Sequence, residues 1–340
     1  MRAKKLLAGG LLAGLSLGCV TSDVHGDAIL GEFYYTIFNG QPNVKKRTFT
    51  YDGGSSLIIS APTVIATTEG ADGIVFATDG DLLVGGQGDR IHKVNPGTGT
   101  VQTRTAGGVA GGSFHVALDP SGTKAWTTGI PGEIAEVPVS PTFSNGISHN
   151  VTGDDGVITS IAFDNSGQAY YTASDAAGFG TVGKINMTTF VTTRFLGTAP
   201  NPIPAAHGMT FDAFTGDLMI FGDGHVSQID LAGGGMTIVS DRAFAGMIFD
   251  QGAVDGKGHA FVASNTGDML FVDYKTSGFI GDLTNFTSTQ FLEANLDDIA
   301  PLSGPGAAVP VPAAIWGGMA LLGGVAIQRM RKGIRAQASP

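Results

Sequence analysis

Acidic and imidazole side chains precede several short apolar runs, and these are the residues of the 340-residue chain best suited to chemistry. They are Glu69, Asp72, His115, Asp154, His207 and Asp250, with Asp155 and Gln251 next to two of them. If the fold brings them together, the imidazoles and carboxylates could hold a divalent cation such as Ca²⁺ or act as general acid and base. The other interpretation is structural, because a histidine at the start of a strand commonly satisfies a buried backbone group. The sequence favours the structural interpretation and singles out no catalytic residue.

The elements that would position these side chains are short strands in a repeated unit. Each unit has an apolar residue, a turn and a second apolar strand, as in residues 118–122 (LDPSG) and 163–167 (FDNSG). Such a turn suits a tight hairpin, since its Asp caps the backbone and its Gly accepts a positive φ. Five units begin at positions 76, 118, 163, 211 and 254, with spacings of 42, 45, 48 and 43 residues.

A period of about 40 to 50 residues with several short strands is that of a β-propeller blade. The sequence therefore predicts an all-β fold, a β-propeller of six blades when residues 32–68 are counted as a divergent unit, with five or seven as alternatives. Repeat units of a propeller are related by rotation, so we expect the candidate residues to face one central channel. The repeat resembles NHL, gluconolactonase-like and streptogramin-lyase-like propellers over about residues 31–303. That architecture hosts hydrolases, lyases and binding modules alike.

The charge of the chain is distributed unevenly. Seven of the 19 Lys and Arg residues lie in the two ends, which leaves 12 basic against 29 acidic residues from 23 to 306, a net charge of −17. So acidic a domain argues against nucleic acid and against anionic membrane surfaces as partners. The 53 glycines fit short strands joined by tight turns.

The N-terminal segment has the pattern of a secretory signal peptide, which we place at residues 1–28. Arg2, Lys4 and Lys5 precede an uncharged, mostly apolar run from 6 to 20, which is too short to span hydrocarbon. The single cysteine, Cys19, ends this run. Its surroundings approximate a lipidation motif in poor register, so we expect it to be removed with the signal peptide, and lipidation is the alternative.

The C-terminal residues 309–340 follow a short linker at 304–308 and combine a proline motif, an apolar run and a basic cluster. The motif is Val309, Pro310, Val311 and Pro312, the run is 313–327, and the cluster contains Arg329, Arg331 and Lys332. As a helix, the run would just span a membrane core with its basic end cytoplasmic. This arrangement resembles the PEP-CTERM sorting tail, although Val311 stands where that motif usually has Glu. The resemblance implies recognition by an exosortase, which removes the tail and transfers the protein to an envelope or matrix acceptor.

The sequence thus predicts a propeller domain at 29–303 in an exported protein of the cell envelope, cell surface or extracellular matrix. Its expected partners are the secretion machinery, the exosortase, the membrane before processing, and an extracellular polysaccharide or matrix. We interpret the domain as a binding or scaffold module. The alternative is a metal-assisted hydrolase or lyase with its site at the central channel. The sequence contains no Gly-x-Ser-x-Gly elbow, phosphate-cradling loop or His-Glu-x-x-His motif, and a divalent cation is the one cofactor considered.

Overall fold

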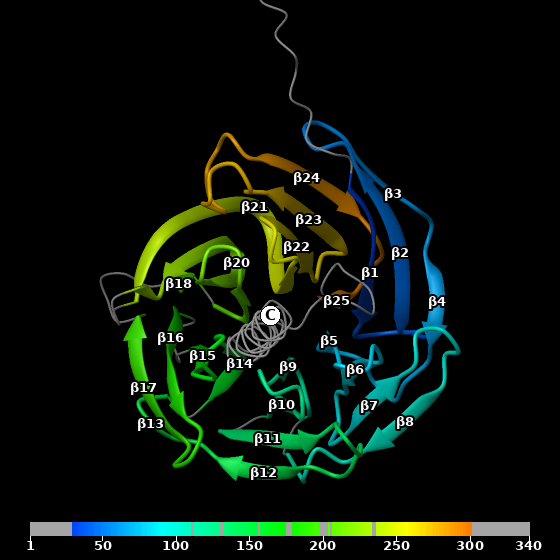
Figure 1. The fold of residues 1–340 in the computed structure, drawn as a ribbon, viewed down its shortest axis with the longest axis vertical. Coiled ribbons are helices and arrows are strands. Elements are labelled where there is room, and N and C mark those ends of the chain that lie inside the picture. Colours follow the sequence, from blue (N-terminus) through cyan, green and yellow to red (C-terminus); the bar gives the residue numbers. More distant parts are fainter. Residues whose placement is uncertain are drawn as a thin grey trace, which may run out of the picture.

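The computed structural model describes residues 29–109, 112–129, 132–155, 157–174, 179–196, 203–204, 206–232 and 236–300. The sheets formed by these residues surround a common axis in the manner of propeller blades (Figure 1). The described residues form strands and turns and contain no α-helix. The prediction of an all-β propeller is therefore confirmed.

The first three sheets contain the N-terminal strands and the last strand. The first sheet has the order β25-β1-β2-β3, with β4 also paired to β2. Its strands are β1 (Ile29–Ile37), β2 (Val44–Tyr51), β3 (Leu57–Ile59), β4 (Thr63–Ala66) and β25 (Leu296–Ile299). The second sheet has the order β5-β6-β7-β8, with strands β5 (Ile74–Phe76), β6 (Leu82–Gly85), β7 (Ile91–Val94) and β8 (Val101–Arg104). The third has the order β12-β11-β10-β9, with strands β9 (Val116–Leu118), β10 (Lys124–Gly129), β11 (Glu133–Pro138) and β12 (Ile147–Asn150).

The remaining two sheets each have six strands. The fourth has the order β13-β17-β16-β15-β14, with β18 paired to β16. Its strands are β13 (Thr152–Gly153), β14 (Ile158–Phe163), β15 (Ala169–Ser174), β16 (Phe179–Asn186), β17 (Val191–Leu196) and β18 (Ile203–Pro204). The fifth runs in sequence order through β19 (Gly208–Asp212), β20 (Asp217–Asp230), β21 (Thr237–Val254), β22 (His259–Ser264), β23 (Asp268–Asp273) and β24 (Phe286–Phe291).

The described residues form five sheets, so the prediction of six blades is wrong and is corrected to five. The difference lies in β21, an 18-residue strand that the last two repeat units share. Its first part pairs with β20 and its last part, from Phe249, pairs with β22, so hydrogen bonding continues from one unit into the next. Periodicity in the sequence counts repeat units, whereas strand pairing decides how many sheets those units form.

The hairpin turns predicted from the repeat form through the expected contacts. Between β9 and β10, Asp119 Oδ1 accepts hydrogen bonds from the backbone N–H groups of Thr123 (3.0 Å) and Lys124 (2.9 Å). Gly122 in the same turn has a φ of 68°, a conformation that disfavours residues with a side chain. These turns fix where each innermost strand ends and the next strand begins.

The ring closes through pairing between the two ends of the described chain. The last strand, β25, lies beside β1 near the axis (Figure 1), and Tyr35 stands opposite Ile299 in an antiparallel register. Arg47 reinforces this junction, because its guanidinium donates a hydrogen bond of 2.6 Å to the carbonyl oxygen of Leu292. Closure of this kind leaves only short, protected strand edges.

Aromatic side chains fill the space between the first sheet and the last repeat unit. Phe261 of β22 lies with its ring centroid 5.4 Å from that of Phe33 and 5.0 Å from that of Phe49. All three are buried. Burial of large aromatic area therefore holds the two ends of the ring together.

Several predictions from the sequence fall outside the described residues. These are the signal peptide at 1–28 with Cys19, the linker at 304–308, and the tail at 309–340 with its proline motif and basic cluster. Within the described ranges, no helix has the length and hydropathy needed to cross a membrane.

Candidate metal centre

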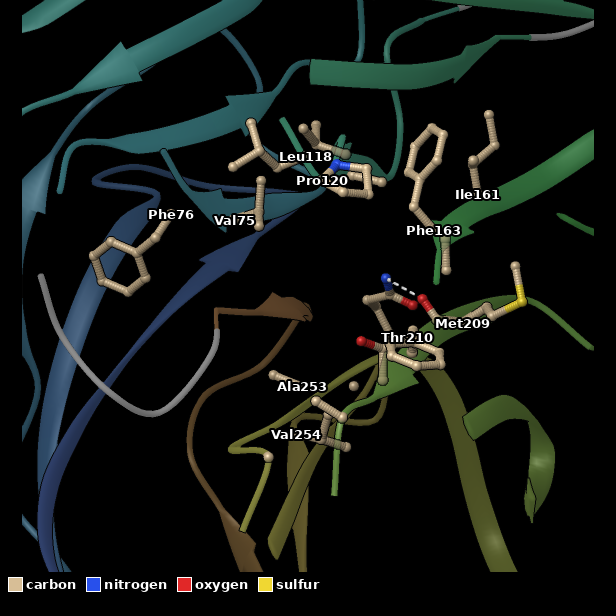
Figure 2. Close-up of a pocket in the computed structure, with 18 of the residues that line it drawn as sticks. Val75, Phe76, Leu118, Pro120, Ile161, Phe163, Met209, Thr210, Ala253 and Val254 are labelled. Carbon is tan, nitrogen blue, oxygen red and sulfur yellow. Dashed lines mark hydrogen bonds between the residues drawn. The ribbon is translucent and has the colours of Figure 1, made fainter. Parts of the chain in front are cut away.

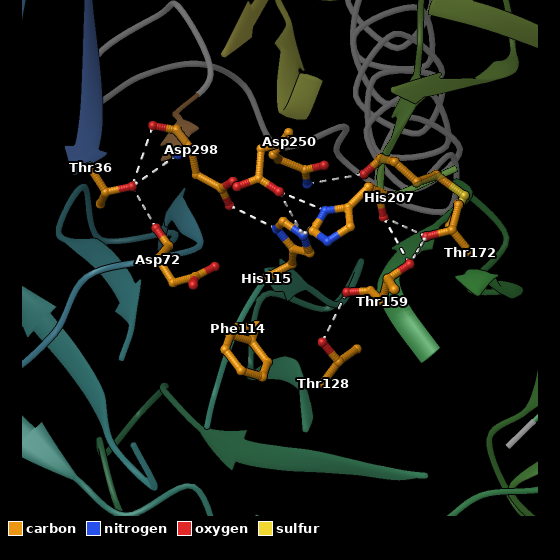
Figure 3. A network of polar contacts seen from close by, with 12 residues as sticks. Thr36, Asp72, Phe114, His115, Thr128, Thr159, Thr172, His207, Asp250 and Asp298 are labelled. Atoms are coloured by element: carbon orange, nitrogen blue, oxygen red, sulfur yellow. Dashed lines mark hydrogen bonds and ion pairs between the residues drawn. The ribbon is translucent and has the colours of Figure 1, made fainter. Parts of the chain in front are cut away.

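The innermost strands meet at the axis, and five of their polar side chains gather there. Asp72 and His115 come just before β5 and β9, and His207 comes just before β19. Asp250 lies within β21, and Asp298 lies within β25. Because repeat units are related by rotation about the axis, these equivalent positions converge on one space (Figure 3).

His115 is the centre of the cluster. Its Nδ1 lies 3.1 Å from Oδ2 of Asp298, and its Nε2 lies 3.6 Å from Oδ1 of Asp250. The same Nε2 is 3.1 Å from Nδ1 of His207, whose Nδ1 is 2.6 Å from Oδ1 of Asp250. The two imidazole rings meet edge to face, with centroids 4.9 Å apart. Four side chains from four strands or strand starts therefore share one set of contacts.

Threonine hydroxyls fix the backbone that carries the cluster. Thr36 of β1 donates a hydrogen bond of 2.6 Å to the carbonyl oxygen of Asp72 and accepts one of 3.1 Å from the backbone N–H of Asp298. On the other side, the hydroxyls of Thr159 and Thr172 donate to the carbonyl oxygen of His207 at 3.0 and 2.7 Å. The cluster is thus positioned by the first, fourth and fifth sheets together.

The carboxylates outnumber the imidazoles at this site. Asp72, Asp250, Asp297 and Asp298 are all buried, as is His115, whereas the side chain of His207 is 46% exposed. Removing charged groups from water is unfavourable unless opposite charge or hydrogen bonds compensate. Four buried carboxyl groups with two imidazoles therefore require additional protons or a cation.

The pKa values of the carboxyl groups shift toward the protonated form at three positions. Burial, the main cause, raises the pKa of Asp72 to about 8. Burial and the neighbouring carboxylates raise the pKa of Asp297 well above its usual value. Burial also raises the pKa of Asp298, although the adjacent His115 opposes that shift. These directions are those expected when too little positive charge reaches the cluster.

The pKa shifts of His115 and Asp250 show where positive charge lies in the cluster. Burial opposes the charged form of His115, but the carboxylates of Asp298, Asp250 and Asp72 outweigh it and raise the pKa of His115 to about 10. Burial likewise opposes ionisation of Asp250, yet its contacts with Asp297, His207 and His115 lower its pKa below the usual range. An Asp250 carboxylate beside a His115 imidazolium is therefore the expected state at neutral pH.

The geometry of the cluster suits a single divalent cation. Three overlapping sets of ligand atoms lie within 4.8 Å of one another, namely His115, His207 and Asp250; Asp72, His115 and Asp298; and Asp250, Asp297 and Asp298. Ligand atoms bind such an ion at about 2.0–2.6 Å, so two atoms that bind the same ion can be separated by about this distance. Oδ2 of Asp297 and Oδ1 of Asp298 are buried and have no hydrogen-bond partner, so both oxygens are open to a cation.

Two residues predicted for the central channel lie elsewhere. The side chain of Glu69 is 78% exposed and lies 4.0 Å from Arg90. Asp154 is exposed and accepts a hydrogen bond of 2.8 Å from the backbone N–H of Arg194 on β17. The residues before β14 turn toward the outer strand, because β13 pairs with β17. Thr159 of β14 contacts the cluster instead, through its hydrogen bond to the carbonyl oxygen of His207 (Figure 3).

Asp155 and Gln251, which follow the predicted Asp154 and Asp250, make contacts outside the cluster. Asp155 is held by the guanidinium of Arg194 and by the Tyr171 hydroxyl at 2.6 Å, away from the cluster. Gln251 follows Asp250 and donates a hydrogen bond of 3.2 Å to the carbonyl oxygen of Met209. Asp297 and Asp298 were not predicted for the site, although Asp298 follows Asp250 by 48 residues, within the range of the repeat spacings.

The cluster should make the metal-free protein less stable as the pH rises from 7 to 9. The pKa of Asp72 is raised from 3.8 to about 8, and that of His115 is raised from 6.5 to about 10. For both groups the folded protein holds the proton more tightly than the unfolded chain. Their stabilisation is therefore complete below pH 3.8 and 6.5, respectively, and is lost as the pH passes through about 8 and about 10.

We expect the free energy of unfolding to fall by more than about 1.4 kcal/mol across this range, the equivalent of one pKa unit. Urea denaturation in EDTA at pH 7 and pH 9 measures it. Equal or greater stability at pH 9 would contradict the assignment.

Comparisons with known proteins identify the fold. No protein-family model matches the sequence, and no curated protein matches it significantly. A chain in the crystal structure of a nidogen/laminin complex is 13% identical with a TM-score of 0.58, over 80% of this chain and 97% of that chain. Virginiamycin B lyase from Staphylococcus aureus is 11% identical with a TM-score of 0.49, over 78% of this chain and 88% of that chain. The PQQ-bound aldose sugar dehydrogenase from Streptomyces coelicolor is 17% identical with a TM-score of 0.46, over 69% and 85%.

At these identities, the likeness to the nidogen/laminin chain shows the fold alone: the described chain is a β-propeller.

Proposed function

We propose that this protein is an extracellular binding module that holds a divalent cation on its propeller axis and uses it to bind a polysaccharide of the envelope or matrix. The observation that carries the proposal is the set of buried carboxyl groups around His115, in which one oxygen each of Asp297 and Asp298 has no hydrogen-bond partner. Oxygens in that condition favour a cation. The partly exposed His207 lies at the edge of the same cluster, where a ligand hydroxyl or carboxylate could reach the ion.

The residue types indicate which cations are suitable. Asp250, Asp298 and Asp72 supply carboxylate oxygens, which suit Ca²⁺, Mg²⁺ and Mn²⁺, and the imidazoles of His115 and His207 would add affinity for Mn²⁺ or Zn²⁺. A bound cation also removes the cause of the raised carboxyl pKa values, since its charge replaces the protons. Cation binding is therefore expected to tighten as the pH rises.

Purified protein that has been stripped with EDTA should bind one divalent cation with a large gain in stability. At a free concentration of about 100 times Kd, the expected gain in the free energy of unfolding is about 2.7 kcal/mol. Separate calorimetric titrations with Ca²⁺, Mn²⁺ and Zn²⁺, each followed by thermal unfolding, measure it. The variant Asp250→Asn should weaken the affinity at least about tenfold, because outer-shell changes alone reach that size.

Glu69→Gln provides the matched control, because Glu69 is an exposed acid outside the cluster. It should leave both the stoichiometry and the affinity unchanged. Absence of stoichiometric binding for all three ions would contradict the proposal, as would equal losses in the Asp250→Asn and Glu69→Gln variants.

A metal-assisted hydrolase or lyase is the second candidate, and the position of His207 favours it. The Nδ1 of His207 lies 2.6 Å from the carboxylate of Asp250 while the side chain remains 46% exposed. An imidazole oriented by a carboxylate can act as a general base on a ligand beside a cation. Turnover of a polymer or lactone that disappears in His207→Gln, while one cation still binds, would favour the enzyme over the binding module.

We also propose that the protein is exported and sorted to the envelope through its terminal segments, as the patterns at 1–28 and 309–340 suggest. Replacing Pro310 and Pro312 with Ala should block removal of the tail in a host that carries the matching exosortase. Immunoblots of cell fractions measure the size and location of the product, with Pro305→Ala in the linker as the control. Normal processing of the double variant would count against this sorting route.

A further inference from the structure

The channel continues beyond the polar cluster as a cavity of about 300 Å³. The cluster occupies the starts of the innermost strands, whereas the cavity is lined by later residues of β5, β9, β14, β19 and β21 (Figure 2). Its volume corresponds to about ten water molecules and reaches the lower end of the range for small-ligand pockets. The cavity is therefore large enough for a compact organic group.

The wall of this cavity is mainly apolar. Val75, Leu118, Ile161, Met209 and Ala253 come from five different strands and surround the space in Figure 2. Side chains of this kind form no hydrogen bonds with a ligand, so they select for an apolar body by burying its surface.

The rim of the cavity carries negative charge. Asp119, Asp164 and Asp255 line it, and its lining contains no Lys, Arg or His. Each of these carboxylates is held by its own turn: Asp164 Oδ1, for example, accepts hydrogen bonds from the backbone N–H groups of Ser166 (2.8 Å) and Gln168 (2.9 Å). The turns hold the carboxylates in place. His259 Nδ1 lies 2.7 Å from Asp255 Oδ2, whereas no basic side chain of the described residues forms an ion pair with Asp119 or Asp164. A ligand with a positive charge at this end would meet three acidic groups.

We propose that this cavity binds a small organic ammonium compound, with its apolar body inside the channel and its charged nitrogen at the acidic rim. Negative charge at the mouth favours the ammonium form, and the apolar wall favours an aromatic or branched alkyl body. The site is distinct from the candidate metal centre, since no carboxyl or imidazole side chain of the cluster lines the cavity. Binding of the ammonium compound should therefore persist in EDTA and in the Asp250→Asn variant.

Three probes that share one apolar body test the proposal on the full-length protein in EDTA: 2-phenylethylamine, 2-phenylethanol and phenylacetate. Calorimetry at low salt should show the amine binding about fivefold or more tightly than the alcohol, and the carboxylate binding more weakly than the alcohol. The preference for the amine should shrink as NaCl is raised, because salt screens charges at the rim. Equal affinity for amine and alcohol, or no binding of the amine at millimolar concentration, would overturn the proposal.

Two kinds of variant place the binding in this cavity. Ala117→Phe adds a ring to the cavity wall and should reduce amine and alcohol affinity together by at least about tenfold, whereas Ile147→Phe on the exposed face of β12 should change neither. The double change Asp119→Asn and Asp164→Asn should abolish most of the preference for the amine and leave alcohol affinity unchanged. If Ala117→Phe does not fold, the double Asn variant still tests the proposal. A preference for the amine that remains in that variant would overturn it.

Discussion

His115→Ala should destabilise the metal-free protein by about 3–5 kcal/mol at pH 7, because it removes the one buried positive charge among buried carboxylates. The side chain of His115 is 3% exposed and lies 3.1 Å from Asp298 and 3.6 Å from Asp250. Without it, those carboxylates must either remain ionised without compensation or take up protons. The loss should therefore become smaller as the pH is lowered toward 5.

Two further variants separate charge from packing. His207→Ala should lose only about 1 kcal/mol, since that side chain is 46% exposed. His115→Gln keeps a donor for Asp298 without the charge and should recover only part of the loss. Urea denaturation of the three variants at pH 7 and pH 5 measures these differences. A small, pH-independent effect of His115→Ala would mean that the carboxyl groups are already neutralised by protons at pH 7.

The sequence allowed the repeat and part of the candidate site to be predicted from local rules. The Asp and Gly turns need only a few neighbouring residues, so a hairpin such as Asp119 to Gly122 follows from local chemistry. Once repeats are placed around an axis, equivalent positions must converge. Asp72, His115, His207 and Asp250 therefore gather as the repeat implied.

Other residues could not be placed without the three-dimensional pairing. Asp154 occupies the corresponding stretch of its repeat, but the short β13 pairs with β17 and draws the chain outward, and Thr159 contacts the cluster instead. Glu69 is too early in its unit and remains at the surface. No periodic pattern distinguishes these cases, because each depends on how one loop meets a neighbouring strand.

Asp297 and Asp298 illustrate the strongest non-local effect. In the sequence they mark the end of the repeats, and nothing near them indicates an axial position. In the structure, β25 returns to pair with β1, which places both carboxyl groups beside residues that precede them by more than a hundred positions, such as His115. The 48-residue spacing from Asp250 to Asp298, within the range of the repeat spacings, is the sequence feature that could have drawn attention to them.

Ring closure and the charge of the cluster are thereby coupled. The strand that closes the ring, β25, also carries Asp298. The hydroxyl of Thr36 in β1 accepts a hydrogen bond from the backbone N–H of that residue. A cation bound between Asp298 and Asp250 would join the closing strand to β21 as well as to β1. We therefore expect cation binding to stabilise the junction between the two ends of the chain more than it stabilises the intermediate sheets.

Phe261→Ala should produce a comparable loss of about 3–5 kcal/mol through packing alone, because a large aromatic side chain is removed from a core that cannot collapse fully. Phe261 is fully buried, and its ring lies 5.4 Å from Phe33 and 5.0 Å from Phe49, so the cavity would open at the junction of the first and last units.

Phe291→Ala is the matched control, since that ring is 64% exposed on β24 and should contribute less than about 0.5 kcal/mol. Urea denaturation at pH 7 measures both variants. The loss in Phe261→Ala should be the same at pH 5, unlike that in His115→Ala, because the rings packed against Phe261 are those of Phe33, Phe49 and Phe271, which do not ionise. A loss below about 1 kcal/mol would show that the closure does not depend on this aromatic core.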